Sequence, residues 1–298
     1  MRSAALVLTD PTGATIPMVV GDEDFRGEFV CDTFTGLPGG VKIRSARGSY
    51  VGSGSTYPRI FRDPRDITLA GWVRYDPTLS GSAEVLRKAS ELTALWPDAT
   101  RTGTLDFSWQ GISYRAYVQP DDQFPILDTS RHYQGILRWK LPLIAPDPYF
   151  YGSEKNSDAP DTSFGFGLLY PLFADGDNVN TGVLEFGSDI ENPQAGSLVN
   201  EGNATAYPKF IVYGDAPSGF RITAGDLAVT WVGVVDPTAP VEVDSLRGTV
   251  TVGGVDRSED LTEAVWAGVP PKGNITHAFA VQGLGYGSAA MILRDTYI

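Results

Sequence analysis

Glycine and proline interrupt this sequence so often that few long helices fit between them. Among 298 residues there are 34 glycines and 21 prolines, together about 18% of the chain against an average near 12%. Both residue types favour turns and disfavour helix interiors. Because 42% of the residues are hydrophobic, the chain can still bury a substantial core. The composition predicts a folded protein of short strands joined by turns, with roughly two domains.

Alternation of apolar and polar residues predicts strands in the first half of the chain. A hairpin is predicted over residues 105–118, with its turn at Gln110-Gly111, and another strand over 135–141. A long strand is predicted over residues 67–75, where one face carries Ile67, Leu69, Val73 and Tyr75. The corresponding apolar positions of the hairpin include Leu105, Phe107 and Tyr114.

One segment has a helical period. Residues 82–96 form an amphipathic pattern, which Pro97 ends and which Ser80 or Ser82 can cap. Its apolar stripe consists of Val85, Ala89, Leu92 and Trp96. We expect this stripe to pack against the neighbouring sheet, and a subunit contact is the alternative.

Charge divides the chain into unequal halves. Residues 1–152 contain 16 basic and 17 acidic side chains, whereas residues 153–298 contain 7 basic and 19 acidic ones. The polar stretch 153–163 (SEKNSDAPDTS) has no periodicity and is predicted to be a linker. At least seven short strands follow it, bounded by turn residues, so residues 164–298 are predicted to form a β-sandwich of jelly-roll type.

The same inventory makes several functions improbable. The net charge of −13 disfavours binding to nucleic acid, which needs clustered Lys and Arg. A single cysteine, Cys31, allows no intrachain disulfide, and neither His132 nor His277 has a second imidazole or thiol at metal-ligand spacing. Apolar runs are too short to span a membrane, and the N-terminal residues do not resemble a secretion signal. We therefore expect no metal, no cofactor and no membrane insertion, with synthesis in a cytoplasm.

Catalytic motifs are also missing from the sequence. There is neither a nucleophile elbow nor a phosphate-binding loop. The stretch 175–180 lacks the central glycine and final Glu of a calcium loop, which favours a solvated turn. Carboxylate clusters at 121–122 and 259–263 keep a glycoside hydrolase open as a minor alternative. The sequence is interpreted as that of a protein that is not an enzyme.

Four motifs, taken in order, resemble those of one protein family. The chain reads RWKLPLIAPDPYFYG over 138–152, LVNEGNATAYPKFIVYG over 198–214, VEVD then GTVTVGG over 241–254, and WAGVPPKGNI over 266–275. This succession resembles siphophage distal tail proteins, the hub subunits of long non-contractile tails. The resemblance extends along nearly the whole chain.

The resemblance implies a mainly β fold in two domains. Residues 1–152 would be a β-sandwich-like domain with one α-helix, and residues 164–298 a galectin-like or carbohydrate-module-like β-sandwich. It also implies a structural virion protein at the distal end of the tail. A hexameric ring of this chain would join the tail tube protein to the tail-tip proteins, and genomic DNA would pass through it without specific binding.

The candidate residues for these roles follow from the predicted strands. As an assembly interface the sequence suggests the strands over 67–75 and 105–118, through Ile67, Leu69, Val73, Tyr75, Leu105, Phe107 and Tyr114. The alternative function is binding of a host-surface saccharide by the second domain. Because pyranose rings stack on exposed indoles, the candidate contacts are Trp231 and Trp266.

Overall fold

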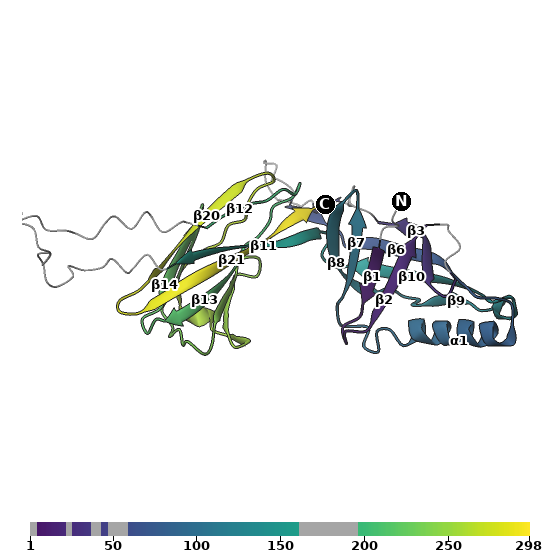
Figure 1. The fold of residues 1–298 in the computed structure, drawn as a ribbon. Coiled ribbons are helices and arrows are strands. Elements are labelled where there is room, and N and C mark those ends of the chain that lie inside the picture. Colours follow the sequence, from purple (N-terminus) through teal and green to yellow (C-terminus); the bar gives the residue numbers. More distant parts are fainter. Residues whose placement is uncertain (1–4, 22–25, 37–42, 47–58, 161–195) are drawn as a thin grey trace, which may run out of the picture. The chain divides into compact units, whose positions relative to one another are not determined.

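The computed structural model describes residues 5–21, 26–36, 43–46, 59–160 and 196–298 (Figure 1). The chain divides into two compact units, Met1–Gly152 with Tyr297–Ile298 (unit 1) and Ser153–Thr296 (unit 2). Both boundaries fall within strands, because β11 spans Phe150–Pro160 and β21 spans Tyr286–Tyr297. Strands dominate both units, and α1 is the single α-helix among the described residues. The mainly β prediction is confirmed.

Unit 1 is built on a sheet that closes on itself. Its strand order is β8-β7-β1-β2-β3-β6-β10, and β10 returns to β8 through the pairs Leu143↔Pro120 and Ile144↔Gln119. Only the β2–β3 pairing in this ring is parallel. The seven strands are β1 Ala5–Thr9, β2 Thr15–Val20, β3 Phe29–Thr35, β6 Arg65–Arg74, β7 Gly103–Trp109, β8 Ile112–Pro120 and β10 Ile136–Ala145.

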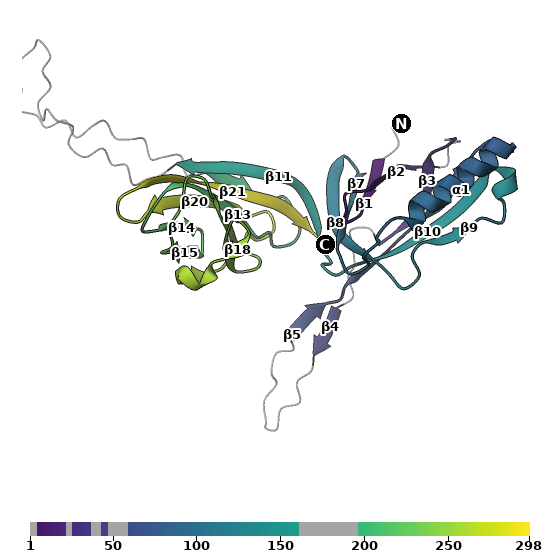
Figure 2. The ribbon, with the colours of Figure 1, turned by 90° about the horizontal axis from the view of Figure 1, so that it is seen from below.

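Three smaller elements complete unit 1. The short strand β9 (Ile126–Asp128) pairs with β10 as an edge strand, and a 3₁₀ turn, η1, spans His132–Gln134. Strands β4 (Ile43–Ala46) and β5 (Arg59–Arg62) form a separate two-stranded ribbon (Figure 2).

The predicted hairpin is confirmed as β7 and β8. Gln110 and Gly111 both have positive φ, 51° and 82°, as a two-residue turn with the right twist requires. Burial alternates along β7, so Leu105 and Phe107 point into unit 1. The closed sheet explains why the inward positions are so strongly apolar, since they fill an interior with no open side.

Helix α1 spans Leu79–Thr93 and packs against β6, β10 and η1. Its N-cap is Thr78, whose hydroxyl accepts the N–H of Gly81 at 3.0 Å, so the predicted caps at Ser80 and Ser82 were wrong. Ser80 and Ser82 lie two and four residues after this cap, inside the helix, where their hydroxyls are not placed to accept the unpaired N–H groups of the first turn.

Three residues of the predicted stripe, Val85, Ala89 and Leu92, are confirmed as the buried face of α1. The predicted end was wrong, because the helix stops at Thr93 and Trp96 lies beyond it with a positive φ of 52°.

Unit 2 is a β-sandwich, as predicted. One sheet has the order β18-β17-β16-β13-β21-β11 and the other β12-β20-β14-β15-β19. Between them lie large buried side chains that include Phe210, Phe220, Trp231 and Phe279. The remaining elements are β12 Ser197–Val199, β13 Lys209–Asp215, β14 Phe220–Ala224, β15 Leu227–Trp231, β16 Val241–Asp244, β17 Thr249–Val252, β18 Val255–Asp256, η2 Ser258–Asp260, β19 Leu261–Val265 and β20 Asn274–Val281.

The predicted linker is a strand. Residues 153–160 belong to β11, while residues 161–163 lie outside the described residues. The charged side chains that suggested a linker are paired with the last strand: Arg294 donates to Glu154 at 2.6 Å, and Lys155 to Asp295 at 2.9 Å. Polar composition therefore concealed a strand whose charges are neutralised by a neighbour 140 residues away.

Candidate functional site

The residues predicted for the assembly interface lie in the core of unit 1 instead. Tyr75 is partly buried, and the other six are at most 8% exposed: Ile67, Leu69, Val73, Leu105, Phe107 and Tyr114. Their strands are not edges either, since β6 lies between β3 and β10, and β7 between β1 and β8. The prediction was wrong because alternation identifies the apolar face of a strand, and the closed sheet turns that face inward.

The two predicted saccharide contacts do not form an exposed platform. Trp231 is 1% exposed, and its indole N–H donates to the Arg257 carbonyl at 3.0 Å. Trp266 is partly buried and packs against the core of unit 2. The assignment of Trp231 was therefore wrong, because a core residue cannot stack on a sugar ring, whereas a contact through the partly buried Trp266 stays a prediction.

The other sequence candidates do not assemble into a site. His277 is buried, with its ring nitrogens 3.0 and 3.1 Å from the carbonyl oxygens of Gly196 and Ala289. Glu263 contacts Thr230 and Arg221, and residues 175–180 lie outside the described residues. Among the residues that the structure describes, no three His, Cys, Asp or Glu side chains converge as metal ligands. No helix in that part of the chain is long and apolar enough to cross a membrane.

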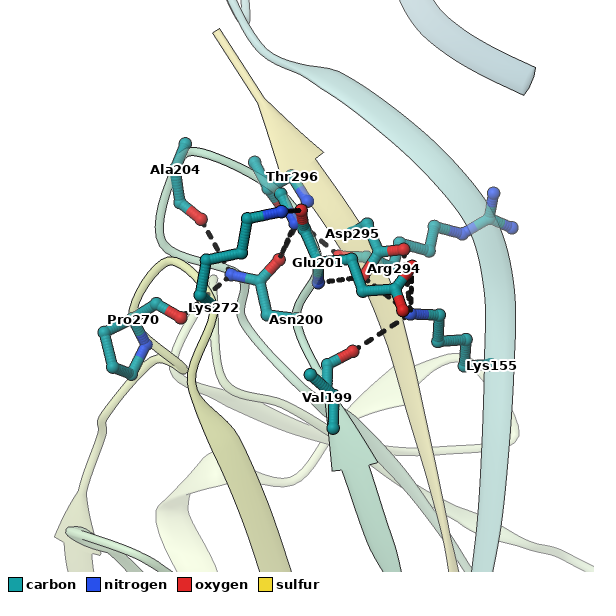
Figure 3. A network of polar contacts seen from close by, with 11 residues as sticks. Lys155, Val199, Asn200, Glu201, Ala204, Pro270, Lys272, Arg294, Asp295 and Thr296 are labelled. Carbon is teal, nitrogen blue, oxygen red and sulfur yellow. Dashed lines mark hydrogen bonds and ion pairs between the residues drawn. The ribbon is translucent and has the colours of Figure 1, made fainter. Parts of the chain in front are cut away.

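Two of the sequence motifs meet in a polar network at one end of unit 2 (Figure 3). Its centre is Asn200, which is completely buried. The amide Nδ2 donates at 2.8 to 3.2 Å among the carbonyls of Ala204, Val269 and Pro270. The amide Oδ1 accepts the N–H groups of Gly202 at 3.0 Å and Thr296 at 3.3 Å. The motifs over 198–214 and 266–275 therefore specify one buried junction rather than a ligand site.

Gly202 has a steric reason to be glycine in this network. A Cβ atom there would lie 1.9 Å from the Thr296 carbonyl oxygen. Lys272 from the second motif donates to the Glu201 carbonyl. The loop after β12, the turn before β20 and the end of β21 are thus held together by side chains and close backbone contact.

A second set of contacts in this network joins the first and last strands of unit 2. Lys155 Nζ donates to Asp295 Oδ1 at 2.9 Å and to the Val199 carbonyl at 3.0 Å. Asp295 Oδ1 also accepts the backbone N–H of Glu201 at 2.7 Å. Asp295 is buried, and every one of these partners lies within unit 2.

The proline-rich motif over 138–152 forms the corresponding junction of unit 1. Arg65 is buried, donates to the Pro148 carbonyl at 3.0 Å and lies 4.6 Å from the centroid of the Phe150 ring. Asp147 accepts the Tyr151 hydroxyl. Burial is the largest cause that raises the pKa of Tyr151, and this hydrogen bond is the next largest. The motif is therefore explained by packing and hydrogen bonding.

The exposed apolar side chains in the described part of unit 1 include two groups that sequence reasoning did not assign to an interface. The first, the α1–η1 surface, consists of Leu79, Leu86 and Tyr133, which are 93%, 47% and 63% exposed. The second, the hairpin tip, consists of Trp109 and Ile112, which pair across the β7–β8 turn. A signal was available for Leu86, which lies beside the buried stripe of α1 and off its apolar face, and for Trp109 and Ile112, which flank the hairpin turn.

A groove of about 480 Å³ separates α1 from the start of β2 and β3. Leu6, Ile16 and Met18 lie along it. At its rim the Lys88 ammonium lies 4.8 Å from the Phe29 ring centroid and donates to Glu91. These contacts satisfy the lysine within unit 1.

Comparisons with known proteins rest on structure alone. No protein-family model and no curated protein sequence matches this chain. The fold matches the crystal structure of the SPP1 Dit (gp 19.1) protein, described as a paradigm of the hub adsorption apparatus in phages that infect Gram-positive hosts. That match has a TM-score of 0.55 and 14% identity, and covers 90% of this chain and 93% of that chain.

Structures of the phage P2 baseplate in its activated conformation, with Ca or with Sr, match with TM-scores of 0.48 and 0.47. Each match has 10% identity and covers 97% of this chain and 98% of the other. The SPP1 Dit match, which covers 90% of this chain, shows that the chain shares the fold of that hub protein. That fold extends over both of its units.

Proposed function

We propose that this chain is the distal tail hub of a siphophage. Copies form a hexameric ring that joins the tail tube to the tail-tip apparatus and leaves a passage for genomic DNA. The observation that carries the proposal is the fold match to SPP1 Dit across 90% of the chain. The protein acts by assembly rather than by catalysis, and it is located in the virion at the end of the tail.

A closed ring requires two different surfaces on each subunit, because each contact joins one face of a subunit to another face of the next. Unit 1 offers such a pair in the α1–η1 surface and the hairpin tip. Exposed Trp and Tyr side chains contribute strongly at protein interfaces once water is excluded, and the neighbouring Leu side chains add apolar area. We assign the ring contacts to these two surfaces in place of the buried residues predicted from the sequence.

The test is the mass of the purified full chain by light scattering, followed by negative-stain images. We expect a closed ring of about six copies, since cyclic symmetry closes a head-to-tail contact. Trp109→Asp and Leu86→Asp should each lower the ring fraction. Leu284→Asp, at a residue 88% exposed in unit 2, should leave it unchanged. A wild-type chain that stays monomeric even with its tail partners would contradict the proposal.

One observation favours a second function, binding of a host saccharide by unit 2. Tyr213 and Tyr286 are 48% and 52% exposed. In the β13–β21 register Tyr213 lies opposite Ser288 and Tyr286 opposite Asp215, which places all four on one face of the sheet. Two aromatic rings beside a carboxylate and a hydroxyl suit a pyranose ring.

A glycan array probed with the full chain tests this second function. Tyr213→Ala and Tyr286→Ala should each abolish a signal that Tyr117→Ala, at an exposed tyrosine of unit 1 outside the proposed ring contacts, leaves intact. A wild-type chain with no signal on bacterial surface glycans would remove this candidate without touching the hub proposal.

A further inference from the structure

Three side chains with complementary chemistry converge on the first and last strands of unit 2 (Figure 3). Lys155 on β11 has its Nζ 2.9 Å from Asp295 on β21. The same Nζ lies 3.6 Å from a carboxylate oxygen of Glu201, in the turn after β12. A lysine amine is thus held against one carboxyl group while a second carboxylate stands beside it.

The geometry supplies the groups that amide formation needs. Lys155 Nζ is the nucleophile, and its hydrogen bond to the Val199 carbonyl fixes its position at 3.0 Å. The backbone N–H of Glu201 donates to Asp295 Oδ1 at 2.7 Å, where negative charge would grow during attack on the carboxyl carbon. A Glu201 carboxylate oxygen, 3.6 Å from Lys155 Nζ, would accept and return a proton through one water or after a small side-chain movement.

We propose that Lys155 and Asp295 form an intramolecular amide bond. Glu201 takes a proton from the Lys155 ammonium, and the free amine attacks Cγ of Asp295. The new N–C bond forms, one C–O bond of the carboxyl group breaks, and the oxygen leaves as water with the two protons released by nitrogen. An ammonium and a carboxylate become a neutral amide and one water, and the reaction requires no further reactant.

The position of this bond gives it a structural consequence. The chain enters unit 2 at Ser153 and leaves it at Thr296, each within two residues of the proposed bond. A covalent link there closes a loop of about 140 residues around the whole sandwich, which restricts the unfolded chain. Tension applied at these two ends would reach the bond before it reached the hydrogen bonds of the sheets. The bond does not depend on ring formation.

The deciding measurement is the intact mass of the purified full chain, taken after denaturation. We expect a mass lower by about 18 Da than the sequence requires, the loss of one water. Proteolysis should then release a branched peptide that contains both Lys155 and Asp295. A chain with the mass of the unmodified sequence would overturn the proposal and leave an ion pair.

Variants locate the reaction and separate it from folding. Lys155→Arg keeps the positive charge, but its guanidinium stays protonated, so the mass loss should vanish. Lys272→Arg changes a lysine of the same network that contacts a carbonyl instead of a carboxylate, and should keep the loss. Glu201→Gln should abolish or slow the loss. If the loss persists in Lys155→Arg, water leaves from another place and the assignment is wrong.

Discussion

Units 1 and 2 have similar apolar cores but different charges and different ways of holding their ends. Residues 1–152 are nearly neutral, whereas residues 153–298 have 19 acidic and 7 basic side chains. Both nonetheless bury a large continuous set of hydrophobic residues. The comparison teaches that charge is confined to the surface and to a few buried junctions. Unit 1 closes by strand pairing, while unit 2 ties its first and last strands with polar side chains.

The largest effects should come from the cores, equally in both units. Leu69 in unit 1 and Leu293 in unit 2 are both fully buried. Truncation to Ala should lower the free energy of unfolding by about 2–5 kcal/mol in each case. Leu284→Ala, at an exposed position, should change it by less than about 0.5 kcal/mol. Guanidinium unfolding of the full chain measures all three losses. A much larger loss at one buried leucine than at the other would show that the two cores do not contribute equally to stability.

The Asn200 junction should matter almost as much, but only in unit 2. Asn200→Ala leaves the N–H groups of Gly202 and Thr296 and three carbonyls without their side-chain partner. We expect a loss of about 2–4 kcal/mol in the stability of unit 2, because buried unpaired groups retain their desolvation cost. Asn274→Ala, which removes an exposed contact with Ser197, is the matched control. Equal melting curves for the two variants would show that the network is dispensable.

Acid should weaken unit 1 through a single buried carboxylate. Burial of Asp10 acts to raise its pKa, but hydrogen bonds from Thr12, Ala14 and Trp96 outweigh it and lower the pKa. A group with a lowered native pKa stabilises the fold above its unfolded value near 3.8 and loses that contribution as pH falls through the native pKa. Between pH 7 and pH 2.5 we expect Asp10→Asn to reduce the drop in stability by about 1 kcal/mol. Thermal melts at both pH values check this, and an unchanged drop would exclude Asp10.

The last prediction uses the native thiol of Cys31 as a probe of unit 1 alone. Burial raises the pKa of Cys31, the only cysteine in the chain, to about 11. Because the thiolate is the reactive form, iodoacetamide should label native protein very slowly and unfolded protein readily. In a guanidinium titration, the denaturant concentration at which Cys31 becomes labelled should fall in Leu69→Ala, which destabilises unit 1. It should stay unchanged in Leu293→Ala, which destabilises unit 2. Rapid labelling of the native chain would show that the closed sheet opens easily.

Local pattern predicted much of the fold. The strand over 67–75, the hairpin turn at Gln110-Gly111 and the stripe of α1 all agree with the structure. Each of these signals involves residues within a few positions of one another, so periodicity and turn chemistry suffice to find them. The helix cap was misplaced by two to four residues, because Thr78, Ser80 and Ser82 all carry a hydroxyl that can cap a helix and local pattern does not distinguish them.

The site predictions failed where the answer depended on which way a face points. Ile67 and Trp231 were assigned to an interface and to a sugar platform, and both are core residues. A strand sequence shows that one face is apolar without showing what covers it. Closure of the sheet through Leu143↔Pro120 covers that face in unit 1, and the facing sheet covers it in unit 2.

The sequence by itself determined the mainly β class, the single amphipathic helix and the strand-rich second half, because these follow from short-range periodicity and from glycine and proline placement. Only the tertiary structure decided that residues 153–160 are a strand, that the sheet of unit 1 closes, and that Lys155, Glu201 and Asp295 meet. Those outcomes depend on pairings between segments as far as 140 residues apart. Such pairings are fixed by the packing of the whole chain, and no local pattern contains them.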